Sequence, residues 1–274
     1  MAGYNQKIVR SGSSYYEIWE YGKPIFIQDE LVEECTTEQP EKTDKEKTKR
    51  RTFDELSEDE QQERLNRMNK TRLEAKWKLL RIVDCNFCDK TSFLTLTTKE
   101  NIQDRDEFNS KLKTFIKRFN YHVLNTKKSK LKYIAVLERQ KRYAWHSHLL
   151  LFGVPYIPHD KLLKLWGHGA VRINKLNHLD DSSNAGRYVV KYMEKGIGQE
   201  LLESFGKKAY LSSRNLKRPE ESKIFLKDKL EFDSSAILYE TEYNSKIYRD
   251  GRLVDNPVRY RKIKVSVEEN FNEI

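Results

Sequence analysis

A stretch near the middle of the chain constrains the fold more than any other. Residues 133–152 read YIAVLERQKRYAWHSHLLLF, two apolar runs around a polar turn, which predicts a β-hairpin. His146 and His148 stand two residues apart, so a strand directs both imidazoles to one face. If the turn is short, Glu138 lies nearly opposite His146 on that face. Two imidazoles and a carboxylate placed in this way predict a divalent-metal site with open positions.

A pair of tyrosines indicates what such a metal would do. Tyr188 and Tyr192 lie four residues apart in NAGRYVVKYMEKG, so a helix would carry both phenols on one face. A metal that polarises a phosphodiester beside hydroxyls able to attack it predicts a nuclease that forms a phosphotyrosine bond. Either tyrosine alone could instead serve helix packing, and the sequence does not say which of the two attacks first.

Charge and cysteine content narrow the class of protein. The chain has 274 residues and a formal net charge of +10, which makes it a candidate for binding nucleic acid. Its three cysteines argue against a disulfide framework and for a reducing compartment. Cys85 and Cys88 form a CxxC without a second pair, so we expect ordinary thiols and no structural zinc. Because no apolar run suits a membrane span or a signal peptide, we expect a cytoplasmic protein.

The order of the expected elements predicts the fold class. Residues 92–98 (SFLTLTT) alternate as a strand does, and apolar residues at helical spacing predict an amphipathic helix over 108–119. The hairpin of 133–152 follows, then a short helix over 158–166 and a strand over 170–174. This β-α-β-β-α-β order is ferredoxin-like. It predicts an α+β domain, with a central antiparallel sheet whose two helices pack on one face.

A long helix is expected before this unit. Ser57 and Glu60 have the spacing of a capping box, and Leu73, Trp77 and Leu80 recur at helical spacing and are expected to pack inward. The remaining faces are basic and offer either a solvated surface or one that contacts phosphate. The basic residues are Arg64, Arg67, Lys70, Arg72, Lys76, Lys78 and Arg81.

Three motifs resemble those of the HUH-type rolling-circle replication initiators of bacterial plasmids and phages, in the same order. Residues 93–98 (FLTLTT) resemble the first motif, and residues 138–152 resemble the second, which carries the two histidines. YVVKYMEK, residues 188–195, resembles the third motif in the two-tyrosine branch, and residues 212–219 (SSRNLKRP) resemble a region that follows it in many members. Tyr143 departs from the pattern, since many relatives have glycine in this turn.

The resemblance implies an enzyme, a metal-dependent, site-specific endonuclease and strand transferase acting on single-stranded DNA. Tyr188 and Tyr192 would be its nucleophiles, and Lys191 and Lys195 would contact DNA phosphate or assist the chemistry. The products would be a 5′-phosphotyrosine and a free 3′-OH that primes replication. Later rejoining of the strand would need no ATP, since the phosphotyrosine conserves the bond energy.

The implied metal is Mn²⁺ or Mg²⁺, held by His146, His148 and Glu138. The implied nucleic-acid partner is single-stranded or hairpin origin DNA. Because the sequence has no GxxxxGK[ST] phosphate loop, a host helicase would be needed, with a host polymerase and single-strand-binding protein, in a bacterial cytoplasm. Two alternatives remain: an RRM-like nucleic-acid-binding module without nuclease activity, and a transposase or mobilisation enzyme of the same superfamily.

The expected organisation has three segments. Residues 1–52 would hold N-terminal strands and a charged linker, and residues 53–220 the ferredoxin/RRM-like HUH nicking-joining endonuclease domain with its leading basic helix. Residues 221–274 would form a β-rich extension, in which Asp250 and Gly251 (DG) predict a hairpin turn and RYRKIK adds a basic patch. The sequence does not indicate a function for the aromatic-rich strands expected over 15–27.

Overall fold

The fold is that of a computed structural model with two compact units, one made of Met1–Glu55 with Pro219–Ile274 and the other of Leu56–Arg218. The structure describes residues 3–26, 51–176, 190–191 and 208–265. None of the helices in these ranges has both the length and the apolar character that a membrane span needs.

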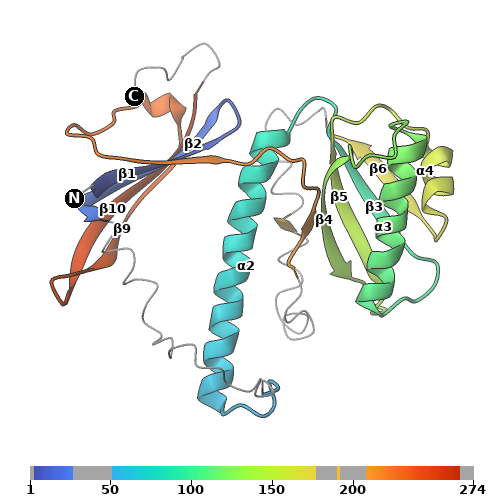
Figure 1. Ribbon diagram of the computed structural model, residues 1–274, viewed down its shortest axis with the longest axis horizontal. Helices are drawn as coiled ribbons and strands as arrows, with labels where there is room; N and C mark the ends of the chain where they lie inside the picture. Colours follow the sequence, from blue (N-terminus) through green and yellow to red (C-terminus); the bar gives the residue numbers. More distant parts are fainter. Residues whose placement is uncertain (1–2, 27–50, 177–189, 192–207, 266–274) are drawn as a thin grey trace. The chain divides into compact units, whose positions relative to one another are not determined.

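The larger unit contains an antiparallel sheet in the predicted ferredoxin-like arrangement (Figure 1). Its elements are β3 (Ser92–Thr97), α3 (Arg105–His122), β4 (Lys132–Arg139), β5 (Trp145–Phe152), α4 (His159–Trp166) and β6 (Val171–Lys175). The strand order is β6-β3-β5-β4-β7, where β7 is the short strand Leu211–Ser212. The β-α-β-β-α-β order and the central position of the first and third strands of this unit are therefore confirmed.

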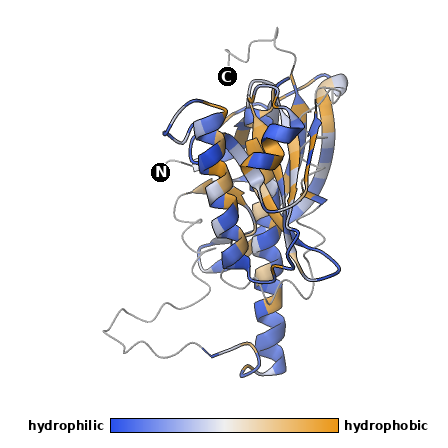
Figure 2. Cartoon of the chain, turned by 90° about the vertical axis from the view of Figure 1, so that its right-hand side faces the viewer, coloured by the Kyte–Doolittle hydropathy of each residue, from blue (hydrophilic) through white to orange (hydrophobic). Residues whose placement is uncertain are grey.

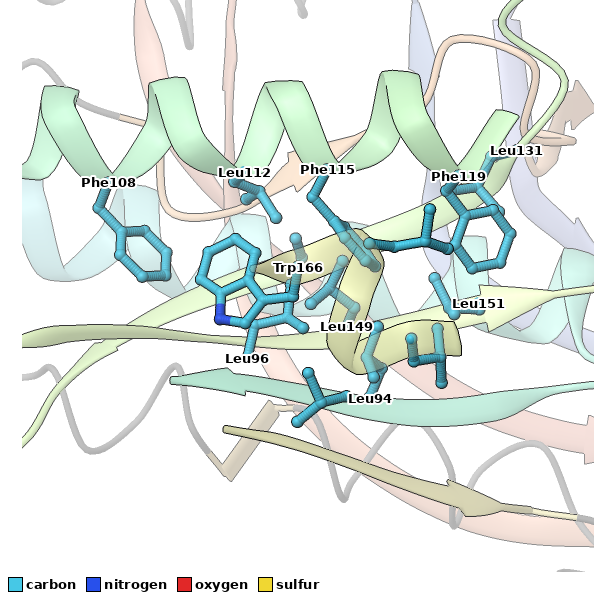
Figure 3. Close-up of a cluster of buried hydrophobic side chains, with 14 of the residues drawn as sticks. Leu94, Leu96, Phe108, Leu112, Phe115, Phe119, Leu131, Leu149, Leu151 and Trp166 are labelled. Atoms are coloured by element: carbon cyan, nitrogen blue, oxygen red, sulfur yellow. The ribbon is translucent and has the colours of Figure 1, made fainter. Parts of the chain in front are cut away.

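One face of this sheet is covered by α3 and α4. The side chain of Asp104 caps the start of α3 by accepting hydrogen bonds from two backbone amides. The helix then buries an apolar stripe at helical spacing, and Trp166 of α4 packs into the same core (Figure 3). The Trp166 indole donates a hydrogen bond to the carbonyl oxygen of Thr97 at 2.9 Å, which ties α4 to the end of β3. The buried stripe consists of Phe108, Leu112, Phe115 and Phe119.

The other face of the sheet has a second, smaller core. Helix α2 (Glu58–Asn86) begins at Ser57, and the predicted capping box with Glu60 is present. Near its C-terminal end, α2 packs apolar residues against β3, β4 and β5. Val190 belongs to this core as well and is 4% exposed. The sheet is therefore covered by α3 and α4 on one side and by α2 on the other.

The predicted inward stripe of α2 is wrong. Leu73 and Trp77 are 51% and 47% exposed, whereas the residues that α2 buries are Leu79, Ile82 and Val83. Only the last turns of the helix face the sheet. The first turns are mostly hydrophilic (Figure 2), so an apolar stripe there has no surface to cover.

The smaller unit combines both ends of the described chain in one antiparallel sheet of order β8-β1-β2-β10-β9. Its elements are β1 (Gly3–Ser11), β2 (Tyr15–Phe26), β8 (Glu220–Ile224), the 3-10 helix η1 (Ser234–Ala236), β9 (Ile237–Arg249) and β10 (Arg252–Lys264). Strands β9 and β10 form a hairpin whose turn residues, Asp250 and Gly251, have φ of 49° and 77°. Positive φ at both positions is what a type I′ turn requires, as the Asp-Gly pair predicts.

Two leucine variants of α2 test which residues of this helix face the sheet. We expect Leu79→Ala to lower the free energy of unfolding by about 2–5 kcal/mol, because Leu79 is fully buried. Leu73→Ala, the matched control on the same helix, should change it by no more than about 0.5 kcal/mol. Urea unfolding followed by circular dichroism measures both. Equal losses would contradict this orientation of α2.

Candidate metal centre

The β4–β5 hairpin brings three possible metal ligands to one face of the sheet. In its register Glu138 lies opposite His146 and Val136 lies opposite His148, so the predicted cross-strand pair is present. On the other side of β5, Thr95 of β3 lies opposite His148. Because β5 is a central strand, hydrogen bonds to neighbours on both sides fix the two histidines in place.

The two imidazoles converge on a single carboxylate oxygen. The Nε2 atoms of His146 and His148 lie 2.9 Å and 2.8 Å from Oε2 of Glu138. One ligand atom from each residue falls within a group no wider than 4.8 Å. The side chains of His146, His148 and Glu138 are only 14%, 5% and 10% exposed. The cluster is therefore compact and largely removed from water.

A second set of contacts orients the His148 ring. The Thr95 hydroxyl lies 3.2 Å from His148 Nδ1 and can accept a hydrogen bond from it. With the proton on Nδ1, Nε2 keeps its lone pair for a metal, which is the usual arrangement of a ligating histidine. The ring of Phe93 stacks on His148 with 5.6 Å between the centroids. Next to His146, Gln140 places its amide nitrogen 3.5 Å from Nδ1.

The donor set fits a divalent cation. Imidazole nitrogens with one carboxylate oxygen suit first-row transition ions, and three ligands from one face leave positions for water or substrate. A metal replaces the contacts that now join each Nε2 to Glu138, and both histidines must then be neutral. Glu138, His146 and His148 are the group of this kind that the described part of the chain offers.

The turn before the histidines explains the glycine of related sequences. Tyr143 has a φ of 65°, a left-handed conformation that glycine adopts without cost. The turn keeps its short form with tyrosine, since the amide of Gln140 donates to the carbonyl of Ala144 at 2.9 Å. The guanidinium of Arg142 also donates to the carbonyl oxygen of Thr98 at 2.6 Å, which ties the turn to the end of β3. The departure at Tyr143 therefore leaves the cross-strand register intact.

The predicted tyrosine segment is described only at two helical residues, Val190 and Lys191. Val190 is buried in the core on the sheet face that carries the metal cluster, and Lys191 is exposed. Three of the predicted catalytic residues, Tyr188, Tyr192 and Lys195, lie outside the described residues.

The other described histidines have structural surroundings. The His159 ring lies 2.9 Å from the carbonyl oxygen of Val171, across the α4–β6 connection. The ring of His168 packs against Trp166, next to the core of the opposite face. Burial lowers the pKa of His168, and the nearby charges of Lys111 and Arg118 lower it further. None of these surroundings brings His159 or His168 to the metal cluster.

Three residues that the motifs did not identify support the site: Thr95, Gln140 and Val190. The alternation of β3 contained a signal for Thr95, because it has the same facing as Phe93 and lies across from His148. Gln140 lies in the turn, where the local sequence does not define a direction. Val190 belongs to an apolar segment in which Val189 was an equally good candidate for burial.

An α+β domain with antiparallel sheets and a Glu-His-His cluster on a central strand is compatible with an HUH endonuclease fold. Residues 91–197 match a family model of replication-associated proteins, the ORF2 family. The matched range begins one residue before β3 and includes the three possible metal ligands. The match supports a role in replication. No curated protein and no solved structure matches the chain.

Removing the Thr95 hydroxyl tests its role in orienting His148. We expect Thr95→Val, which keeps the shape of the side chain, to weaken Mn²⁺ binding by about 10- to 100-fold, because outer contacts of this kind fix the ligating tautomer. Isothermal titration calorimetry on the full chain measures the dissociation constant. Thr114→Val is the matched control, since that hydroxyl bonds only to its own helix, at the carbonyl of Ser110. An unchanged affinity in Thr95→Val would show that Thr95 does not orient the ligand.

Proposed function

We propose that this protein is a rolling-circle replication initiator that nicks single-stranded origin DNA and later rejoins the strand. One observation carries the proposal: the buried cluster of Glu138, His146 and His148 lies within the stretch that matches a replication-associated family. A bound Mn²⁺ or Mg²⁺ would supply Lewis acidity at the scissile phosphate and at the leaving oxygen. The three side chains would hold that cation at the polar end of the sheet face, next to the core.

The proposed nucleophiles are Tyr188 and Tyr192. A phenol oxygen attacks phosphorus, the bond from phosphorus to the 3′ oxygen breaks, and the phenol proton passes to a base or to solvent. The products are a 5′-phosphotyrosine and a strand that ends in a 3′-OH. The ordinary pKa of tyrosine is about 10, so the site must favour the phenolate during the step. Lys191 and Lys195 would contribute positive charge there and contact DNA phosphate.

The position of Val190 supports the choice of these tyrosines. Val190 lies between them in the sequence and is buried in the same core as Phe93. Phe93 in turn stacks on His148. A continuous set of packed side chains therefore connects the residue between the two tyrosines with a ligand of the metal cluster.

Two tyrosines suit a full round of replication. The first would hold the 5′ end of the parent strand while the free 3′-OH primes synthesis. The second would cut the regenerated origin, and the new 3′-OH would attack the first phosphotyrosine to close the strand. The proposed partners are single-stranded or hairpin origin DNA and a host helicase, polymerase and single-strand-binding protein, in the cytoplasm of a bacterial host.

The main competing function, an RRM-like module that binds RNA without cleaving it, needs exposed aromatic residues on the central strands. On β3 and β5 the aromatic side chains are instead buried: Phe93 is 2% exposed, Trp145 5% and Phe152 3%. Each belongs to one of the two cores that cover the sheet. The sheet therefore offers no stacking platform on these two strands, which favours the nuclease.

A cleavage assay tests the proposal. Single-stranded DNA from the origin of the parent replicon is incubated with the protein and Mn²⁺ or EDTA, then separated under denaturing conditions. We expect a covalent protein–DNA adduct that requires the metal. The adduct should be lost in His146→Ala, because one ligand is removed, and in the double variant Tyr188→Phe with Tyr192→Phe, because no phenol remains.

The single tyrosine variants assign the order of attack. Loss of the adduct in only one of Tyr188→Phe and Tyr192→Phe would identify the first nucleophile. Adducts in both would show that the two phenols are interchangeable. Binding of origin DNA with no adduct from any fragment would overturn the nuclease and favour the binding module.

A further inference from the structure

The sheet of the smaller unit has two faces with different chemistry. Strand pairing places Tyr260 beside Trp19 on one side and Thr241 on the other. Because side chains alternate along a strand, Tyr239 and Tyr243 share this face with them. We call Trp19, Tyr239, Tyr243 and Tyr260 the aromatic face.

The rings of the aromatic face form a connected row. Tyr260 lies 4.9 Å from Trp19 and 6.1 Å from Tyr239, measured between ring centroids. The indole of Trp19 donates a hydrogen bond to the hydroxyl of Tyr243. Tyr239 and Tyr243 are 57% and 45% exposed, so the row ends in two rings that solvent can reach.

Lysines lie beside these rings on the same face. Strand pairing places Lys262 opposite Tyr239 on one side, and it continues the face to Lys264. Both ammonium groups lie over the ring of Tyr15, at 5.4 Å and 5.7 Å from its centroid. Lys7 lies over Trp19 at 5.4 Å and also pairs with Glu221.

The opposite face of the same strands has its positive charges matched by carboxylates. Arg259 forms an ion pair with Glu240. Arg261 is 2% exposed and lies 2.8 Å from the carboxylate of Glu20. These arginines hold the sheet together, whereas the lysines of the aromatic face accompany exposed rings.

We propose that the aromatic face binds single-stranded DNA without sequence preference, as a surface separate from the metal centre. Exposed tyrosine rings would stack on unpaired bases, and the neighbouring lysines would contact the phosphates between them. Duplex DNA does not fit this chemistry, because its bases already stack on one another. A protein that exposes a long single strand during replication would gain a hold on that strand away from the cleavage site.

Binding to a homopolymer tests the proposal independently of any origin. The probe is a fluorescein-labelled oligo-dT of about 16 nucleotides, followed by fluorescence anisotropy with the full chain. We expect the double variant Tyr239→Thr with Tyr243→Thr to raise the dissociation constant by about tenfold or more. Threonine suits a strand, so the sheet should persist, and a thermal melt checks this.

Tyr248→Thr is the matched control. Tyr248 lies on β9 as well, is 38% exposed, and points to the opposite face by alternation. Its replacement should leave the dissociation constant within about twofold of the wild-type value. An equal loss in Tyr248→Thr, with both proteins folded, would overturn the proposal.

Salt dependence separates stacking from charge. Lys262→Gln with Lys264→Gln should lower the slope of log affinity against log salt by about 1.4, because two phosphate contacts are lost. The tyrosine pair should leave that slope unchanged while affinity falls. A wild-type protein that does not bind oligo-dT, or a tyrosine variant that binds it as tightly, would overturn the proposal.

A fourth variant keeps this test separate from the proposed nicking. His148→Ala should lose the covalent adduct with origin DNA but bind oligo-dT as the wild type does. If the wild type forms no adduct and its oligo-dT binding still depends on Tyr239 and Tyr243, the nuclease is overturned and the aromatic face stands.

Discussion

The cross-strand register of β4 and β5 is the constraint on which the candidate metal centre depends. A slip of one residue would turn His146 and His148 to the opposite face and separate them from Glu138. The cores on both sides of the sheet prevent this slip. Leu149 and Leu151 are buried against α3 and α4, and Leu150 and Phe152 on the α2 side. Any change of register would expose one set of these side chains or force it into the wrong core, so the folding of the sheet also places the ligands.

The metal cluster occupies the polar end of an otherwise apolar sheet face. Along β5 this face runs from Phe152 and Leu150 in the α2 core to His148 and then His146. The histidines are therefore partly desolvated, which strengthens their interactions with a cation or a phosphate compared with the same groups in water. Phe93 belongs to the core and also stacks on His148, so it connects packing with ligand geometry. The opposite face could not host this chemistry, because it is packed throughout by α3 and α4.

How much the sequence predicts depends on whether the signal is local. The strands, the α3 stripe, the Ser57 cap and the Glu138–His146 pairing all follow from patterns within a few residues, and the structure confirms them. The inward face of α2 was wrong, because Leu73, Trp77 and Leu80 fit helical spacing as well as Leu79, Ile82 and Val83 do. Only the extent of the sheet decides between the two stripes. The pairing of β2 with β10 joins residues more than two hundred positions apart, and no local pattern announces it.

The basic run RYRKIK shows how strand alternation changes the meaning of composition. By count it contains four cations that a partner could use. In the sheet, Arg259 and Arg261 turn to the face where they meet carboxylates, and Arg261 also donates to the carbonyl oxygen of Leu230 at 2.9 Å. Lys262 and Lys264 turn to the aromatic face. Arginine suits the paired role, because its planar group forms several directed hydrogen bonds, whereas lysine is a mobile point charge on a flexible stem. The two residue types are therefore divided between folding and the proposed DNA contact by the period of the strand alone.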